Sequence, residues 1–140
     1  MSLTRKKFRE IVFYFLYSTE LQSAQDEGSF VSLAMRELKV TRQNVRQAME
    51  YAGPLVRERD YFDGVIREAV KGVYDLERVS LVERLVLRLG IYELQREPQI
   101  PGKVAISEAM RLSVKFGSVG SEKFINAVLD RVMKQQDADK

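Results

Sequence analysis

Four cations near the start of the chain are the residues best suited to chemistry with a partner. Arg5, Lys6, Lys7 and Arg9 stand among ten residues that hold a single acid, Glu10. Those ten residues carry four of the 23 basic groups and one of the 20 acidic groups, so the remaining residues balance at 19 of each. A local basic excess on a balanced chain is typical of a nucleic-acid or acidic-surface contact. We predict that this segment binds an anionic partner.

A helix is the element expected to position these cations. Phe8, Ile11 or Val12, Phe15 and Thr19 repeat at helical spacing and predict one buried face. Cations at a helix N-terminus are unfavourable by a few tenths of a kcal/mol or more. Four of them therefore favour an anionic partner over the alternative, a merely solvated helix start.

A secretory signal is a second alternative for the same stretch, because a basic segment precedes the apolar residues 11–17. Glu10 interrupts the junction, and residues 18–22 offer no small-residue cleavage site. We favour the helix.

The residue types that are missing exclude several chemistries. The 140 residues include no Cys and no His, which removes disulfides, a thiol nucleophile, a histidine base and the usual zinc sites. No apolar run approaches the roughly 18 residues that cross a bilayer. Only carboxylates, Lys, Tyr, Ser and Thr remain as possible catalytic groups, and we expect no metal and no membrane partner.

The most apolar helix is expected to start at Ser80. Glu83, three residues later, completes a capping box with it. Apolar residues cover most of the circumference and leave a thin polar strip through Arg84 and Arg88, which predicts a central helix. Gly90 lowers helix stability by about 1 kcal/mol relative to Ala, so it indicates a closely crossing neighbour.

Further helices are expected before this one. Residues 22–29 are predicted to be a loop, and residues 30–38 a short helix. Thr41 is expected to cap the next helix, which Gly53 and Pro54 must bend or end because proline lacks an N–H.

A helix is also expected from residues 60–63 onward. Its apolar residues are predicted to face inward through Val73, and the helix to run until Val79.

After the central helix, residues 97–102 read as a rigid connector with two prolines. Gly117 is expected to end the following helix, and Ser121 to cap the last one. We predict an all-α fold of about seven helices in two small sub-bundles, one domain over residues 1–133, and a frayed polar tail over residues 134–140.

Three separated stretches carry motifs that belong together. They are RKKFRE with LY (5–10, 16–17), VERLVLRLGIYEL (82–94), and the C-terminal group IPGKVAISEA, KFG and KFINAVLD (100–109, 115–117, 123–130). In order and spacing they resemble the N-utilization substance B (NusB) family of transcription antitermination proteins. The resemblance is strong over residues 80–131 and weak over residues 22–60.

This resemblance implies a role in the antitermination complex that protects ribosomal RNA transcription in the cytoplasm. Family members bind a short single-stranded RNA element, boxA, together with a small ribosomal-subunit protein, NusE. Other Nus factors and RNA polymerase would be indirect partners.

The resemblance also carries roles onto nine residues. Structural alternatives stay open for three of them: Phe124 as core, Glu83 as the helix cap, and Tyr17 as the end of an apolar run. Cations that follow phosphates, with an aromatic platform for unstacked bases, suit single-stranded RNA. The expected RNA-binding residues are Arg5, Lys6, Lys7, Arg9, Lys123, Phe124 and Asn126, and the expected partner-binding residues are Tyr17 and Glu83.

Two departures from the family pattern stand near these residues. Gly120 occupies a position that is usually acidic, followed here by Ser121 and Glu122. Phe8 stands where the family often has Ala. We expect both to alter the local RNA-facing surface.

Two other functions are alternatives to an RNA-binding adaptor. A homodimeric or protein-only scaffold would mask the basic surface. An enzyme is suggested because the module resembles the N-terminal domain of some ribosomal-RNA cytosine methyltransferases. The sequence shows no Gly-rich strand-to-helix motif and no Cys nucleophile, so we expect no methyl transfer, no cofactor and a protein that is not an enzyme.

Overall fold

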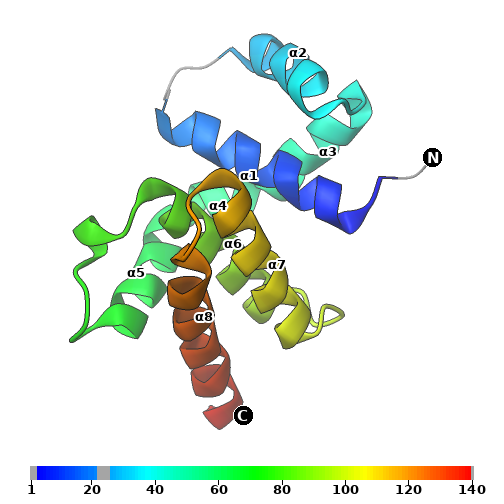
Figure 1. Cartoon of the computed structure of the whole chain (residues 1–140). Helices are drawn as coiled ribbons and strands as arrows, with labels where there is room; N and C mark the ends of the chain where they lie inside the picture. The colour runs from blue at the N-terminus through cyan, green and yellow to red at the C-terminus, as the bar shows by residue number, and fades with distance from the viewer. Residues whose placement is uncertain (1–2, 22–25, 140) are drawn as a thin grey trace. The chain divides into compact units, whose positions relative to one another are not determined.

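Helices make up all the regular secondary structure of the described residues. The computed structural model describes residues 3–21 and 26–139, which contain eight α-helices, one 3-10 helix and no strand (Figure 1). The all-α prediction is confirmed. The chain divides into two compact units, Met1–Arg57 and Glu58–Lys140, as expected for two small sub-bundles.

The described residues of the first unit form four helices, of which α3 packs against both α1 and α2. Aromatic contacts join α1 to α2, because the Phe30 ring lies 5.8 Å from that of Tyr14 and 5.2 Å from that of Phe15. The helices are α1 (Arg5–Leu21), α2 (Glu27–Leu38), α3 (Arg42–Tyr51) and α4 (Gly53–Arg57).

Helix α3 begins and ends where the sequence predicts. The Thr41 hydroxyl accepts from the Asn44 N–H at 3.1 Å, and the Asn44 side chain accepts from the Thr41 N–H at 3.4 Å. This capping box satisfies two of the N–H groups that a helix start leaves unpaired. Helix α3 ends at Tyr51 and a new helix, α4, begins at Gly53, so the predicted break in the helix is confirmed.

The start of α2 corrects the predicted loop. Residues 22–25 of that loop lie outside the described residues, and residues 27–29 are helical. The Asp26 carboxylate caps the helix, since it accepts from the Ser29 N–H at 3.1 Å and the Ser29 hydroxyl at 2.9 Å. The prediction treated Gly28 as a loop signal and overlooked Asp26 as a cap.

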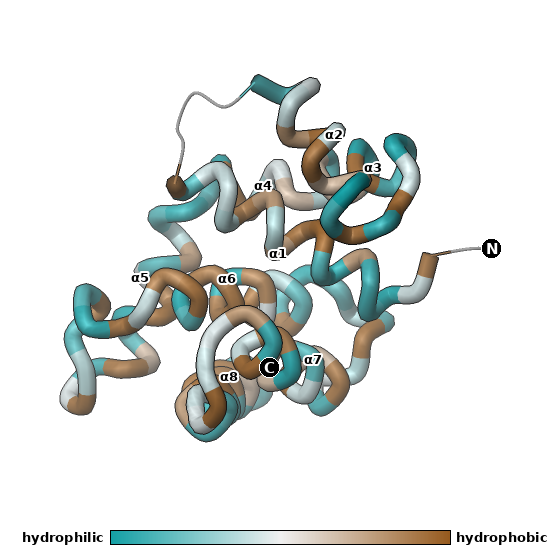
Figure 2. Tube along the Cα trace, turned by 45° about the horizontal axis from the view of Figure 1, so that its top comes forward, coloured by the Kyte–Doolittle hydropathy of each residue, from teal (hydrophilic) through white to brown (hydrophobic). Residues whose placement is uncertain are grey.

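The second unit is organised around α6, which packs against α5, α7 and α8. A Cβ placed on Gly90 would lie 2.7 Å from Leu129 Cδ1 of α8, so the predicted close crossing is confirmed. The elements are α5 (Arg59–Val70), the 3-10 helix η1 (Leu76–Arg78), α6 (Leu81–Arg96), α7 (Gly102–Phe116) and α8 (Ser121–Ala138). Figure 2 shows apolar and polar residues alternating along these helices, as expected when each buries one face.

The capping box at the start of α6 is confirmed, but its predicted polar strip is not. The Ser80 hydroxyl accepts from the Glu83 N–H at 3.1 Å, and the Glu83 carboxylate accepts from the Ser80 N–H at 3.3 Å. Arg88 is only 2% exposed because it is paired with Asp63 of α5. The predicted polar strip is wrong at Arg88 because pairing with the Asp63 carboxylate allows this arginine to enter the core.

Two further predictions about helix length are wrong. Helix α5 ends at Val70 rather than near Val79, and Val73 is 70% exposed. Residues 134–138, which were expected to be a frayed tail, are helical and continue α8, where the Lys134 ammonium lies 2.9 Å from the Asp130 carboxylate.

Candidate nucleic-acid interface

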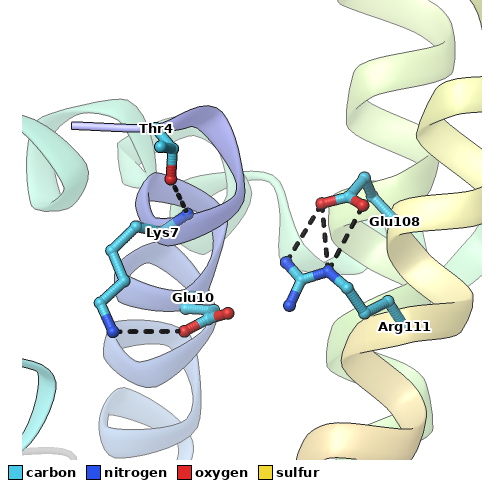
Figure 3. Close-up of polar contacts among 5 residues, drawn as sticks. All are labelled: Thr4, Lys7, Glu10, Glu108 and Arg111. Carbon is cyan, nitrogen blue, oxygen red and sulfur yellow. Dashed lines mark hydrogen bonds and ion pairs between the residues drawn. The ribbon is translucent and has the colours of Figure 1, made fainter. Parts of the chain in front are cut away.

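The first turns of α1 carry the predicted basic cluster. Thr4 precedes the helix and its hydroxyl accepts from the Lys7 N–H at 3.1 Å. Arg5 and Lys6 are exposed, whereas Lys7 is half-buried and its ammonium lies 3.7 Å from the Glu10 carboxylate (Figure 3). Of the four predicted cations, the two at the helix start are thus the most accessible to a phosphate.

The fourth cation, Arg9, occupies a different environment. It is 6% exposed, and the neighbouring Glu10 is 4% exposed. Burying a charged group is unfavourable unless the group is paired or hydrogen-bonded. RNA binding by Arg9 remains a prediction, and its burial makes it a less accessible phosphate ligand than Arg5.

A groove lies beside this cluster, between the start of α1 and α3. Its volume is about 460 Å³. Phe8 contributes to it and packs edge-on against Tyr51, with ring centroids 5.3 Å apart. The bulk of Phe8, which departs from the family's frequent Ala, is thus built into the wall of this groove. The lining residues are Leu3, Thr4, Arg5, Phe8, Gln43, Asn44 and Gln47.

The second predicted group of RNA-binding residues lies at the start of α8. Lys123 and Asn126 are exposed, and Phe124 is half-buried. Phe124 lines an apolar pocket of about 150 Å³ between the end of α5 and α8. Phe124 is therefore not a fully buried core residue, because its ring packs against Tyr74 and also lines an open pocket.

Tyr74 is a member of this pocket that sequence reasoning missed. Its ring stands edge-on to Phe124, with centroids 5.4 Å apart and planes at 81°. Tyr74 is 49% exposed and lies after the end of α5. The signal in the sequence was an aromatic residue shortly after Gly72, and it was missed because α5 was predicted to extend past Val73.

The turn before α8 differs from the predicted cap. Gly120, with φ of 102°, is the N-cap residue, and its N–H donates to the Glu122 carboxylate at 2.8 Å. Ser121 is the first helical residue and its hydroxyl donates to the Ser118 carbonyl at 2.8 Å, so the prediction that Ser121 caps the helix is wrong. Gly120 adopts a left-handed conformation that an L side chain rarely takes. Gly120 thus places a turn residue at the position that the family pattern usually gives to an acid, and the Glu122 carboxylate folds back onto the Gly120 N–H.

The two predicted partner-binding residues have structural roles as well. The Tyr17 ring stacks on that of Phe13 at 6.1 Å, one turn earlier on α1. The Glu83 carboxylate closes the cap of α6. Their roles toward a partner stay predictions.

The structure groups the predicted residues by unit. Arg5, Lys6, Lys7 and Arg9 share the first turns of α1 in one unit; Lys123, Phe124 and Asn126 share the first turns of α8 in the other. Tyr17 belongs to the first unit and Glu83 to the second.

Metal-ligating clusters and membrane-spanning helices are both absent from residues 3–21 and 26–139. No group of three or more acidic side chains there could hold a metal ion. Within the same residues, no helix has the length and apolarity to cross a membrane.

Comparison with known proteins identifies the family. The model of the NusB family matches residues 6–134. The chain belongs to the NusB family. Among curated relatives, "Transcription antitermination protein NusB" of Dehalococcoides mccartyi (strain CBDB1) is 37% identical over 134 residues, covering 96% of this chain and 92% of that protein. The protein of the same description from Escherichia coli O139:H28 is 34% identical, covering 91% and 89%.

Solved NusB-like structures agree with this membership. T. maritima NusB has a TM-score of 0.78 and 30% identity, covering 96% of this chain and 93% of that one. A chain in the structure described as "Crystal Structure of a Plectonemic RNA Supercoil" has a TM-score of 0.81 and 25% identity, covering 97% and 98%. The predicted family is confirmed, and NusB relatives support the role of an antitermination factor.

Proposed function

We propose that this chain is a non-catalytic, cytoplasmic RNA-binding adaptor that supports ribosomal RNA transcription by binding boxA-like single-stranded RNA together with NusE. Other Nus factors and RNA polymerase are its indirect partners. The observation that carries the proposal is the exposed pair Arg5 and Lys6 at the start of α1, in a chain whose relatives are transcription antitermination proteins.

Two features of the surface support an RNA ligand. The cations of α1 supply charge that follows phosphates, while Phe124 and Tyr74 supply an aromatic edge beside an apolar pocket. Proteins commonly bind single-stranded RNA through cations that contact phosphates and aromatic rings that stack on bases, and a stacked base contributes about 1–3 kcal/mol. Because salt screens the attraction between cations and phosphates, this binding should weaken as the salt concentration rises.

The test is a titration of labelled boxA-like RNA with the purified chain, alone and with NusE, at several salt concentrations. The logarithm of affinity should fall by about 0.7 per log unit of salt for each neutralised phosphate. Arg5→Ala/Lys6→Ala should weaken binding and flatten this slope. A matched control is Arg36→Ala/Lys134→Ala, which removes two exposed cations outside both surfaces.

An unchanged slope in the first variant would remove the start of α1 from the RNA site. Sedimentation of the wild-type chain with and without RNA addresses the alternative of a masked homodimer. If a homodimer persists at saturating RNA without binding it, the adaptor proposal is wrong.

A further inference from the structure

Side-chain amides, not cations, dominate one wall of the groove between α1 and α3. Gln43 and Gln47 lie one turn apart on α3, so they share a helix face. Both are exposed, and both line the groove of about 460 Å³ that Arg5 and Phe8 also line. A cation, an aromatic ring and two amides therefore face one space.

The helix that carries the amides is firmly placed within its unit. Val45 and Ala48 on its opposite face are fully buried. Asn44 is occupied by the capping box with Thr41. Neither Gln43 nor Gln47 makes a side-chain hydrogen bond to another residue in the described part of the chain. Both amides are thus presented on a fixed backbone with donors and acceptors available.

Amides and cations do different work at an RNA surface. Contacts to phosphates hold the strand but carry no sequence information, whereas hydrogen bonds to base edges read the sequence. A glutamine amide offers a donor and an acceptor side by side, which matches the paired donor and acceptor on a base edge. Bases of single-stranded RNA are unstacked and expose these edges.

We propose that Gln43 and Gln47 read base edges of the single-stranded RNA whose backbone Arg5 contacts, so that the α1–α3 groove contributes sequence preference. Phe8 forms the apolar surface against which a base in the groove packs. The occupant is RNA because the groove opens beside the basic start of α1, which is complementary to a phosphate backbone. This inference rests on the proposed function.

The test compares two labelled RNAs of equal length and composition, one boxA-like and one scrambled, binding to the full chain. Gln43→Ala/Gln47→Ala should lower affinity for the boxA-like RNA about tenfold or more, in line with a bidentate base contact. Affinity for the scrambled RNA should change less than about twofold, and the salt slope should stay unchanged, because no phosphate contact is removed. Arg5→Ala should instead weaken both RNAs alike and reduce the slope.

The matched control is Gln135→Ala, an exposed glutamine on α8 in the other unit, which should leave both affinities unchanged. Thermal unfolding of the double variant checks that it is folded. If the wild-type chain prefers boxA-like RNA and the double variant keeps that preference, this inference is wrong while the proposed function stands. If the wild-type chain binds neither RNA, both fail. If the double variant loses NusE binding but keeps RNA discrimination, the groove holds protein and the inference is overturned.

Discussion

Asp63 holds Arg88 by two parallel hydrogen bonds. Arg88 Nε donates to Asp63 Oδ1 at 2.7 Å, and Arg88 Nη2 donates to Asp63 Oδ2 at 2.9 Å. The Arg88 side chain is 3% exposed and that of Asp63 is 15% exposed. This paired geometry joins α5 to α6 with a fixed orientation, because a planar guanidinium matches a carboxylate in only a few arrangements.

Removing the carboxylate of this pair should strongly destabilise the fold. Asp63→Ala leaves the Arg88 charge buried without its fork partner, and we expect a loss of about 3–5 kcal/mol in the free energy of unfolding. Urea denaturation measures it. The control is Glu58→Ala, which removes the partner of the more exposed Arg96 and should have a much smaller effect. Equal losses in the two variants would show that burial does not distinguish the pairs.

Alanine at two helical glycines should have opposite effects. Gly90→Ala places a Cβ 2.7 Å from Leu129 Cδ1, and Leu129 is fully buried, so we expect destabilisation of about 1–3 kcal/mol. Gly64→Ala in α5 meets nothing within 4 Å and should stabilise the protein by about 0.5–1 kcal/mol. Thermal unfolding shows whether each variant is more or less stable than the wild type. If both variants are more stable, the Leu129 side chain can move away from the added Cβ without loss of stability.

Tyr74 and Phe124 should contribute to RNA affinity without contributing to its salt dependence. Tyr74→Ala should weaken binding by about 1–3 kcal/mol, since a stacking ring is lost but no charge changes. Tyr74→Phe keeps the ring and should bind like the wild type. The measurement is RNA titration at several salt concentrations, with circular dichroism to check folding. Equal affinity of Tyr74→Ala and the wild type would exclude this pocket from the RNA site.

The cap of α2 should respond to acid. The side-chain hydrogen bond from Ser29, with a smaller contribution from the Ser29 N–H, lowers the pKa of the Asp26 carboxyl below its ordinary value of 3.8. A lowered pKa means that the capping stabilisation is present above the ordinary value and is lost as pH falls through the folded-state pKa. Ser29→Ala should raise the pKa of Asp26 toward the ordinary value, measured by NMR titration of the carboxyl carbon. A pKa that does not move would assign the shift to another cause.

Local sequence patterns predicted much of the fold, but they did not predict features that depend on residues distant in the sequence. The caps at Thr41 and Ser80 and the close approach at Gly90 each depend on a few adjacent residues or on one unusual residue, so their signals are visible in the sequence. The burial of Arg88 depends on a carboxylate 25 residues away, which helical periodicity does not reveal. The end of α5 was missed because Val73 continues the apolar spacing although the helix has already stopped.

The residues of the candidate site also differ in whether the sequence alone could predict them. The basic cluster was visible as a charge imbalance, and Phe124 through its motif. Tyr74 and the amides of α3 carry no motif, and only the folded chain brings them beside Phe124 and Arg5, respectively.

Glu83 is predicted to bind a partner and also stabilises the start of α6 through the capping box. Glu83 Oε1 already accepts from the Ser80 N–H. A cationic group of NusE that drew this carboxylate away would leave that N–H unsatisfied and loosen the first turn of α6. Binding of a partner at Glu83 would then be energetically linked to fraying of the helix start. Glu83→Gln keeps an acceptor oxygen for the cap but removes the charge that attracts the partner, so it would distinguish the two roles.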